Sequence, residues 1–284
     1  MNETIQRAQN HVWSTSRVLE QRRFELLFGD NGDPDAIIAA LEPYKTPDGG
    51  YGYALEPDGR GPTSQPPHIW TALEALDDAR TTDAAVCDHL AAISAPDGGI
   101  PVALPTLEPY ARAPWWAIGT EGTLLATALH FAPLAKHGVT HAWLDGAETF
   151  CWSAVDAIEK THPYEAEAAI VFLDAARDRE RASTAAERLG RLVREQGLVG
   201  AQPEGYSAGE IHHPHDFAKR PDSLARAWFS DAEVEASLDH LAAQQREDGG
   251  WPVTWAIWTP AIEIEWSGLV TISALKILRA YNRI

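Results

Sequence analysis

The sequence predicts an all-α protein, and three observations lead to that class. Apolar residues recur with the helical period along several segments, beginning with Ile5, Val12, Leu19 and Leu26. No segment alternates apolar and polar residues for long enough to indicate a strand. The tripeptide Asp-Gly-Gly, which is typical of a helix end followed by a turn, occurs three times. These features predict helices joined by glycine turns.

The expected helices follow from apolar period and from start and stop signals. The first is one long helix whose stripe runs from Ile5 to Leu26. The most clearly marked helix begins after Ser230, which forms a capping box with Glu233, and ends at the glycine pair after Asp248. The remaining helices are expected at residues 35–44, 68–79, 83–93, 121–136, 143–160, 164–177, 184–196 and 267–281.

The spacing of the turns predicts a repeat. Asp48, Asp97 and Asp248 each begin an Asp-Gly-Gly, and their positions differ by 49 and 151. The longer interval is close to three times the shorter, as a unit of about fifty residues would give, with further copies near 148 and 198. About five or six such helical hairpins, closed into a ring, would bury every inward face. The sequence therefore predicts one α/α toroid over residues 1–284, without a domain boundary.

Composition and charge exclude several classes of partner. The chain has 284 residues, of which 45% are hydrophobic, and a formal net charge of −18. Nucleic acids and anionic membranes are bound through excess Lys and Arg, so neither is expected as a partner. Charges interrupt every apolar run near the N-terminus, which argues against a signal peptide or stable membrane insertion and favours a cytoplasmic protein. Cys87 and Cys151 are interpreted as buried apolar residues, and the oligomeric state is left open.

One turn carries a family resemblance. Residues 245–251, Gln-Arg-Glu-Asp-Gly-Gly-Trp, resemble the Gln-x-x-Asp-Gly-x-Trp repeat of the terpenoid cyclase and protein prenyltransferase superfamily. The copy at Asp48 keeps an aromatic residue, Tyr51, whereas the copy at Asp97 has Ile100 in that place. The resemblance implies an α/α toroid with a central cavity. Residues 52–76 are also similar to a group of bacterial toroid proteins.

Two acidic motifs of the superfamily are missing, which narrows the implied activity. There is no Asp-x-Asp-Asp tetrad to protonate an alkene, and Asp77-Asp78 does not continue into an Asp-Asp-x-x-Asp site for magnesium and diphosphate. The resemblance therefore implies a cyclase, isomerase or lyase that differs from the standard terpene synthases. We expect it to act by acid–base proton transfer on a small apolar molecule, of terpenoid type, without a cofactor.

Substrate-binding side chains are expected where Pro-rich connections enter the inner helices. These places combine aromatic residues or histidine with a hydrogen-bonding group, as expected for an apolar cavity with a few placed polar groups. Tryptophan faces can also stabilise cationic intermediates. The residues expected to bind substrate are Trp70, Trp115, Trp116, Glu121, Tyr164, Trp255, Trp258 and Trp266.

Proton transfer is predicted at Glu263 and Glu265, which enter the last helix between tryptophans. In an extended segment, residues two apart share a face, so like-charge repulsion and burial would keep one of the two carboxyls protonated. We expect one glutamate to donate the proton, with His68, His215 and Asp216 as partners across the ring. The alternative is that both acids only stabilise the helix N-terminus, by about 1 kcal/mol.

Two further clusters are left with two interpretations each. Residues 210–216 contain three histidines and two acids, and His213, His215 and Asp216 could hold a metal ion such as zinc. A ligand from a second element is not visible, so the metal is the weaker alternative and no metal is expected. Residues 56–60 contain Glu56, Asp58 and Arg60, which could line the cavity or form an ion pair within the loop, and the loop role is favoured.

Two other functions compete with the apolar-substrate enzyme. The α/α barrel also occurs in carbohydrate-active hydrolases and lyases, in which tryptophans bind sugar rings and two acids supply the acid and the base. The third possibility is a toroid that binds or scaffolds without catalysis. The acidic and aromatic composition of the expected binding residues favours the first function.

Overall fold

The computed structural model describes residues 2–284 and confirms the all-α class. In this part of the chain there are twelve α-helices, three short 3-10 helices and no β-strand, only isolated bridges such as Lys45 with Tyr51. The chain divides into two compact units, one formed by residues up to Asp33 together with Ala186–Ile284, the other by Pro34–Ala185. That all the hairpins close into one ring stays a prediction. Among residues 2–284, no helix is both long enough and apolar enough to cross a bilayer.

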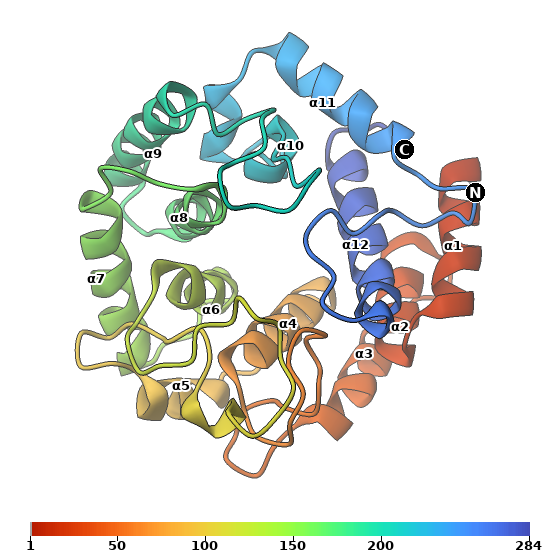
Figure 1. Ribbon diagram of the computed structural model, residues 1–284. Helices are drawn as coiled ribbons and strands as arrows, with labels where there is room; N and C mark the ends of the chain where they lie inside the picture. The colour runs from red at the N-terminus through yellow and green to blue at the C-terminus, as the bar shows by residue number, and fades with distance from the viewer. Residues whose placement is uncertain (1) are drawn as a thin grey trace. The chain divides into compact units, whose positions relative to one another are not determined.

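In the contiguous unit, α4, α6 and α8 form one row of helices, and α5 and α7 form a second row beside it (Figure 1). Helix α6 packs against α4, α7 and α8, and α5 packs against α7. The amphipathic period that predicted these segments is thus satisfied by burial against neighbouring helices. The elements of this unit are α3 (Pro34–Leu41), η1 (Glu42–Tyr44), α4 (Pro66–Asp78), α5 (Val86–Ile93), η2 (Pro105–Leu107), α6 (Leu124–Lys136), α7 (Ala142–Asp156) and α8 (Pro163–Ala175).

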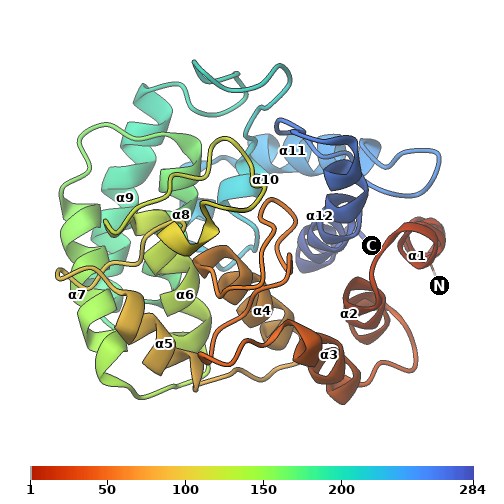
Figure 2. The same cartoon turned by 60° about the horizontal axis from the view of Figure 1, so that its bottom comes forward.

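The second unit is built from the two ends of the chain. Helix α12 packs against α1, α2 and α11, and α10 packs against α11 (Figures 1 and 2). Helix α9 contains the point at which the two units divide. The elements of this unit, with α9 shared at its boundary, are α1 (Glu3–Thr15), α2 (Val18–Phe28), α9 (Arg179–Glu195), α10 (Pro214–Phe217), η3 (Leu224–Trp228), α11 (Asp231–Ala243) and α12 (Pro260–Ala280).

The prediction of a single long first helix is wrong. Ser16 and Arg17 have extended backbone angles, so the chain turns between α1 and α2. Gly268 of α12 approaches this corner so closely that an added Cβ would lie 2.2 Å from the Ser16 hydroxyl oxygen. The break between α1 and α2 therefore lies where α12 packs against the corner.

The three Asp-Gly-Gly turns have the same geometry, as the repeat predicted. In each, the second glycine carbonyl accepts the N–H of Thr46, Ala95 or Arg246, at 2.8 to 3.0 Å. In each, the aspartate also accepts the second glycine N–H, at 2.9 to 3.3 Å. The first glycine has φ between 87° and 93°, which disfavours other residues. The copy expected near 148 is wrong, because Asp145 and Gly146 lie inside α7.

A side chain from a neighbouring helix covers each turn. A Cβ added at Gly250 would lie 2.5 Å from His11 Nε2, and one added at Gly99 would lie 2.6 Å from Phe150. The His11 imidazole lies 3.0 Å from the Ser267 hydroxyl and 3.4 Å from the Asp248 carboxylate. The second glycine therefore allows the close approach of each turn to a helix.

The turn at Asp48 repeats the use of histidine. His89 Nδ1 lies 3.2 Å from the Asp48 carbonyl, and the ring packs beside Gly50. A histidine on a neighbouring helix packs against both the Asp48 turn and the Asp248 turn, which is explained if the histidine docks the turn on that helix. We therefore interpret His11, Ser267 and Asp248 as a structural group.

Acid is expected to destabilise the fold through His130. Its Nδ1 and Nε2 lie 2.6 and 3.0 Å from the Ala126 and Pro66 carbonyls, and burial lowers the pKa of His130 to about 4, although both carbonyls act in the opposite direction. At pH values between the ordinary histidine pKa of about 6.5 and the lowered pKa of about 4, the unfolded chain binds more protons than the folded one. The free energy of unfolding should therefore fall as pH drops from about 6.5 to about 4, by about 3 kcal/mol from this residue.

Urea unfolding at several pH values checks this expectation. His130→Gln keeps one hydrogen-bond donor and has no titrating ring, so it should be less stable at pH 7 but lose less stability on acidification. Equal pH slopes for His130→Gln and the unchanged protein would contradict the assignment.

Candidate functional site

The most unusual site is a loop that buries two carboxyl groups. Glu56 and Asp58 are 4% and 3% exposed, and His68, in the first turn of α4, is fully buried. We call residues 53–65 the acidic loop. It connects the first Asp-Gly-Gly turn to α4, within the contiguous unit. Buried ionisable groups that lie together are enriched at functional sites, so this loop is a candidate functional site.

Hydrogen bonds fix these three residues to one another. The Glu56 N–H donates to His68 Nδ1 at 3.0 Å, and the Asp58 N–H donates to Glu56 Oε2 at 2.8 Å. Because Nδ1 of His68 is an acceptor, a neutral His68 carries its proton on Nε2. The loop thus positions the imidazole and determines which nitrogen can donate.

The backbone before Glu56 is strained. Tyr53 and Ala54 have φ values of 57° and 58°, in the left-handed region that residues other than glycine seldom occupy. The Tyr53 N–H donates to the Gly61 carbonyl at 2.9 Å and helps to hold this conformation. Two consecutive left-handed residues cost on the order of 1–3 kcal/mol each, and such strain concentrates at functional sites.

An indole ring covers the acidic loop. A Cβ added at Gly59 would lie 2.3 Å from a ring carbon of Trp116, so only glycine allows this contact. The rings of Trp116 and His68 are 6.2 Å apart between centroids. Residues 110–116 are held beside the loop by backbone hydrogen bonds from Arg60 to Ala111 and from Ala113 to Asp58. The buried polar groups therefore lie next to apolar aromatic surface.

Three exposed aromatic side chains belong to the same two segments. Tyr53, Tyr110 and Trp115 are 48%, 38% and 45% exposed. The Tyr110 ring lies over Gly61, where an added Cβ would be 2.9 Å from the ring. Both segments thus offer flat apolar surface to solvent as well as to the buried groups.

The predicted substrate-binding residues of the contiguous unit are only partly brought together. His68 and Trp116 meet at the acidic loop. Trp70 follows on α4, and its ring lies 5.8 Å from His130. Glu121 is exposed before α6, and Tyr164 is half-buried on α8. Substrate contact by these residues stays a prediction.

The glutamates predicted as proton donors are not arranged as expected. Both lie within α12, which begins at Pro260, and residues two apart on a helix do not share a face. Glu263 is 46% exposed and lies 3.4 Å from the Arg246 guanidinium. The premise of an extended segment is therefore wrong, whereas the catalytic roles of Glu263 and Glu265 stay predictions.

The tryptophans near α12 form a smaller cluster. Trp255 and Trp266 meet edge to face at 5.0 Å between ring centroids, which is a favourable aromatic geometry. Trp258 lies between them in sequence and is half-buried. This cluster belongs to the unit formed by the chain ends, whereas the acidic loop belongs to the contiguous unit.

The histidine cluster lies at a pocket in that same unit. His213 and His215 stack with planes 7° apart, and His213 lies 4.4 Å from His240 between ring centroids. His215 Nδ1 is 2.6 Å from the Ser237 hydroxyl, which ties α10 to α11. Asp216 accepts the His213 N–H at 2.7 Å and stands 3.7 Å from His215 Nε2.

The proposed metal ligands do not converge on one point. His213, His215 and Asp216 instead make ring-stacking and capping contacts. Within residues 2–284, no group of three or more His, Cys, Asp or Glu side chains has the arrangement of a metal site. Elemental analysis of protein purified without chelators would measure directly whether a metal ion is bound.

Comparisons with known proteins leave the family open. No protein-family model matches the sequence, and no curated protein is significantly similar to it. The superfamily resemblance of residues 245–251 thus remains an expectation from sequence.

The burial of Glu56 and Asp58 was not predicted from the sequence. The ion pair within the loop, which the sequence favoured over a cavity role for Glu56, Asp58 and Arg60, stays a prediction. The left-handed Tyr53 and Ala54 carry no sequence signal, since neither is a residue that favours this conformation. Only the short spacing between the two acids and the Pro-Pro-His start of α4 indicated the site.

Proposed function

We propose that this protein is an enzyme that transfers protons to and from an apolar small molecule at the acidic loop. The observation that carries the proposal is the burial of Glu56, Asp58 and His68 together, under an indole ring. The loop is also strained at Tyr53 and Ala54, and both strain and clustered ionisable groups concentrate at functional sites.

The polar groups have complementary roles in this proposal. A positioned carboxyl group can donate its proton to an alkene or carbonyl, and a second carboxylate can take a proton back. Glu56 and Asp58 are the pair from which that acid is drawn, and the other accepts a proton later in the cycle. His68, fixed by the Glu56 N–H, relays protons through Nε2.

The aromatic surroundings support an apolar substrate. Trp116 borders the site, and π faces stabilise the positive charge that develops when an alkene is protonated. The superfamily resemblance points to the same class, a terpenoid-like molecule. The acidic loop would then replace the acidic tetrad that the sequence lacks.

A carbohydrate-active enzyme is the second candidate. Tyr53, Tyr110 and Trp115 expose flat rings beside two buried acids, and sugar rings stack on such surfaces. A sugar substrate would use the two carboxyl groups as acid and base as well. The two candidates therefore differ in substrate and share the catalytic groups.

Deuterium incorporation tests the proposal. The protein is incubated in deuterium oxide with squalene or geranylgeraniol, and the products are examined by mass spectrometry. We expect deuterium at carbon, and at least a tenfold lower rate in Glu56→Gln or Asp58→Asn, equivalent to about 1.4 kcal/mol in the barrier. Glu108→Gln, an exposed acid near the same segment, is the matched control and should keep the rate.

Thermal unfolding of each variant separates lost chemistry from lost fold. Soluble oligosaccharides, neutral and acidic, form the second arm, with new reducing ends as the readout. Reducing ends without deuterated isoprenoid would favour the carbohydrate enzyme. Activity that is unchanged in folded Glu56→Gln and Asp58→Asn would remove the acidic loop from catalysis, and no conversion in either arm would favour a non-catalytic toroid.

A further inference from the structure

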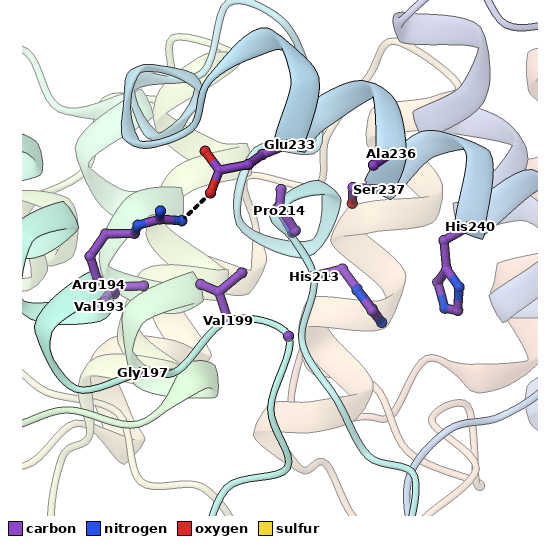
Figure 3. Close-up of a pocket in the computed structure, with 11 residues that line it drawn as sticks. Val193, Arg194, Gly197, Val199, His213, Pro214, Glu233, Ala236, Ser237 and His240 are labelled. Carbon is purple, nitrogen blue, oxygen red and sulfur yellow. Dashed lines mark ion pairs between the residues drawn. The ribbon is translucent and has the colours of Figure 1, made fainter.

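A pocket of about 580 Å³ lies in the unit formed by the chain ends. Its walls are the end of α9 with the following loop, the residues that begin α10, and one face of α11 (Figure 3). The volume falls within the usual range of small-molecule sites, roughly 300–1,000 Å³. The acidic loop contributes nothing to this pocket.

The ionised groups of the pocket balance one another. Arg194 and Glu233 form an ion pair at 2.6 Å (Figure 3). Hydrogen bonds from the Ser230 N–H and hydroxyl, together with Arg194, hold the pKa of Glu233 at about 2. Burial, and then the neighbouring His240, lower the pKa of His213 to about 4, so His213 is uncharged at pH 7. A charged ligand would meet no uncompensated opposite charge from these three residues.

The same lining offers hydrogen-bond donors and acceptors. The described residues engage one terminal nitrogen of Arg194 through Glu233, which leaves guanidinium N–H groups for a ligand. The His213 side chain accepts the Asp216 N–H in the capping box that begins α10, so a neutral His213 offers its other ring nitrogen as a donor. His240, whose Nε2 lies 3.1 Å from the Gln244 amide nitrogen, presents a second imidazole beside it (Figure 3).

Apolar surface completes the pocket. Val193 and Val199 contribute from α9 and its following loop, Pro214 from the start of α10 and Ala236 from α11. In Figure 3, Val199 lies between the ion pair and the two imidazoles. A matching ligand therefore has C–H groups in its middle and hydrogen-bonding groups at its ends.

We propose that this pocket binds an uncharged small molecule with several hydroxyl groups, a polyol or a sugar. Hydroxyl groups donate and accept at once, which matches guanidinium and neutral imidazole without adding charge. The C–H faces of such a molecule fit the valine, proline and alanine wall. The site is independent of the acidic loop and of the reaction proposed there.

Amide chemical shifts test this binding class. D-glucose and myo-inositol are the uncharged hydroxylated probes, sodium acetate and inorganic phosphate the anions, and ethylammonium chloride the cation. We expect saturable shifts of the Val199, Gly200 and Ala236 amides with at least one hydroxylated probe, and weaker or no shifts with the ions.

Two tryptophan substitutions on α11 supply the control. Ala236 is exposed and lines the pocket, so Ala236→Trp should fill it and weaken binding at least tenfold. Ala242 is exposed on the same helix outside the lining, so Ala242→Trp should bind as the unchanged protein does. Tighter binding of an ion, unchanged affinity in Ala236→Trp, or no saturable shift with either hydroxylated probe up to about 100 mM would overturn the proposal.

Discussion

Gly249→Ala is expected to destabilise the protein by about 3 kcal/mol or more. Gly249 has φ of 93°, and an added Cβ would lie 2.1 Å from the Arg7 carbonyl oxygen. The left-handed conformation costs an alanine about 1 kcal/mol, and the clash adds more because a backbone carbonyl of α1 cannot move aside like a side chain. The turn and α1 would have to separate.

Gly49→Ala is the matched control for this prediction. Gly49 occupies the same place in the first Asp-Gly-Gly turn, with φ of 87°, but nothing lies within 4 Å of its added Cβ. Gly49→Ala should lower the free energy of unfolding by about 1 kcal/mol, because only the left-handed conformation is unfavourable there. Urea unfolding measures both variants. Equal losses at the two glycines would show that the contact with Arg7 is unimportant.

Trp251→Ala is expected to cost about 3–5 kcal/mol, the range for removing a large buried aromatic side chain. Trp251 is 1% exposed, and its indole N–H donates to the Leu241 carbonyl at 2.7 Å. Its backbone N–H donates to the Thr271 hydroxyl at 3.1 Å, which joins the turn to α12. The truncation would leave a cavity between α11 and α12.

Two further variants divide this effect into its parts. Trp251→Phe keeps most of the apolar volume but loses the indole N–H, so we expect an intermediate loss of about 1–2 kcal/mol. Trp115→Ala removes a tryptophan that is 45% exposed and should cost less than about 1 kcal/mol. Thermal or urea unfolding gives all three values. A loss for Trp115→Ala as large as that for Trp251→Ala would contradict burial as the cause.

Local signals predicted the elements that depend on local interactions. The capping box of Ser230 and Glu233 forms as expected at the start of α11. The Asp-Gly-Gly turns share one geometry because glycine and aspartate determine it within five residues. The helices themselves were predicted for the same reason, because the apolar period and the capping residues are properties of short segments.

Features that depend on distant residues could not be predicted in this way. The break at Ser16 lies against Gly268, more than two hundred positions away, and no local pattern reveals that contact. Helix α12 begins at Pro260, seven residues before the expected start, although Ile262, Ile264 and Trp266 alternate with acids as in a strand. A proline at the first helical position outweighs that alternation.

The candidate site was predicted only in part. His68 and Trp116 were chosen for their positions before and near inner helices, and they meet. The burial of Glu56 and Asp58 depends on the approach of residues 110–116, which no local pattern in residues 53–65 reveals. Glu263 and Glu265 were paired on the assumption of an extended backbone, and the helix separates them.

The pairing of α1 with α12 sets an order for events on the ribosome. Arg7 donates to the Arg246 carbonyl across 239 positions, so α1 and α2 leave the exit tunnel long before their partners exist. At about 5–20 residues per second, the delay is on the order of 10–50 s. The contiguous unit, residues 34–185, is synthesised in full during that time. The N-terminal helices meanwhile wait with their apolar stripe uncovered, because the helix that buries it has not yet been made.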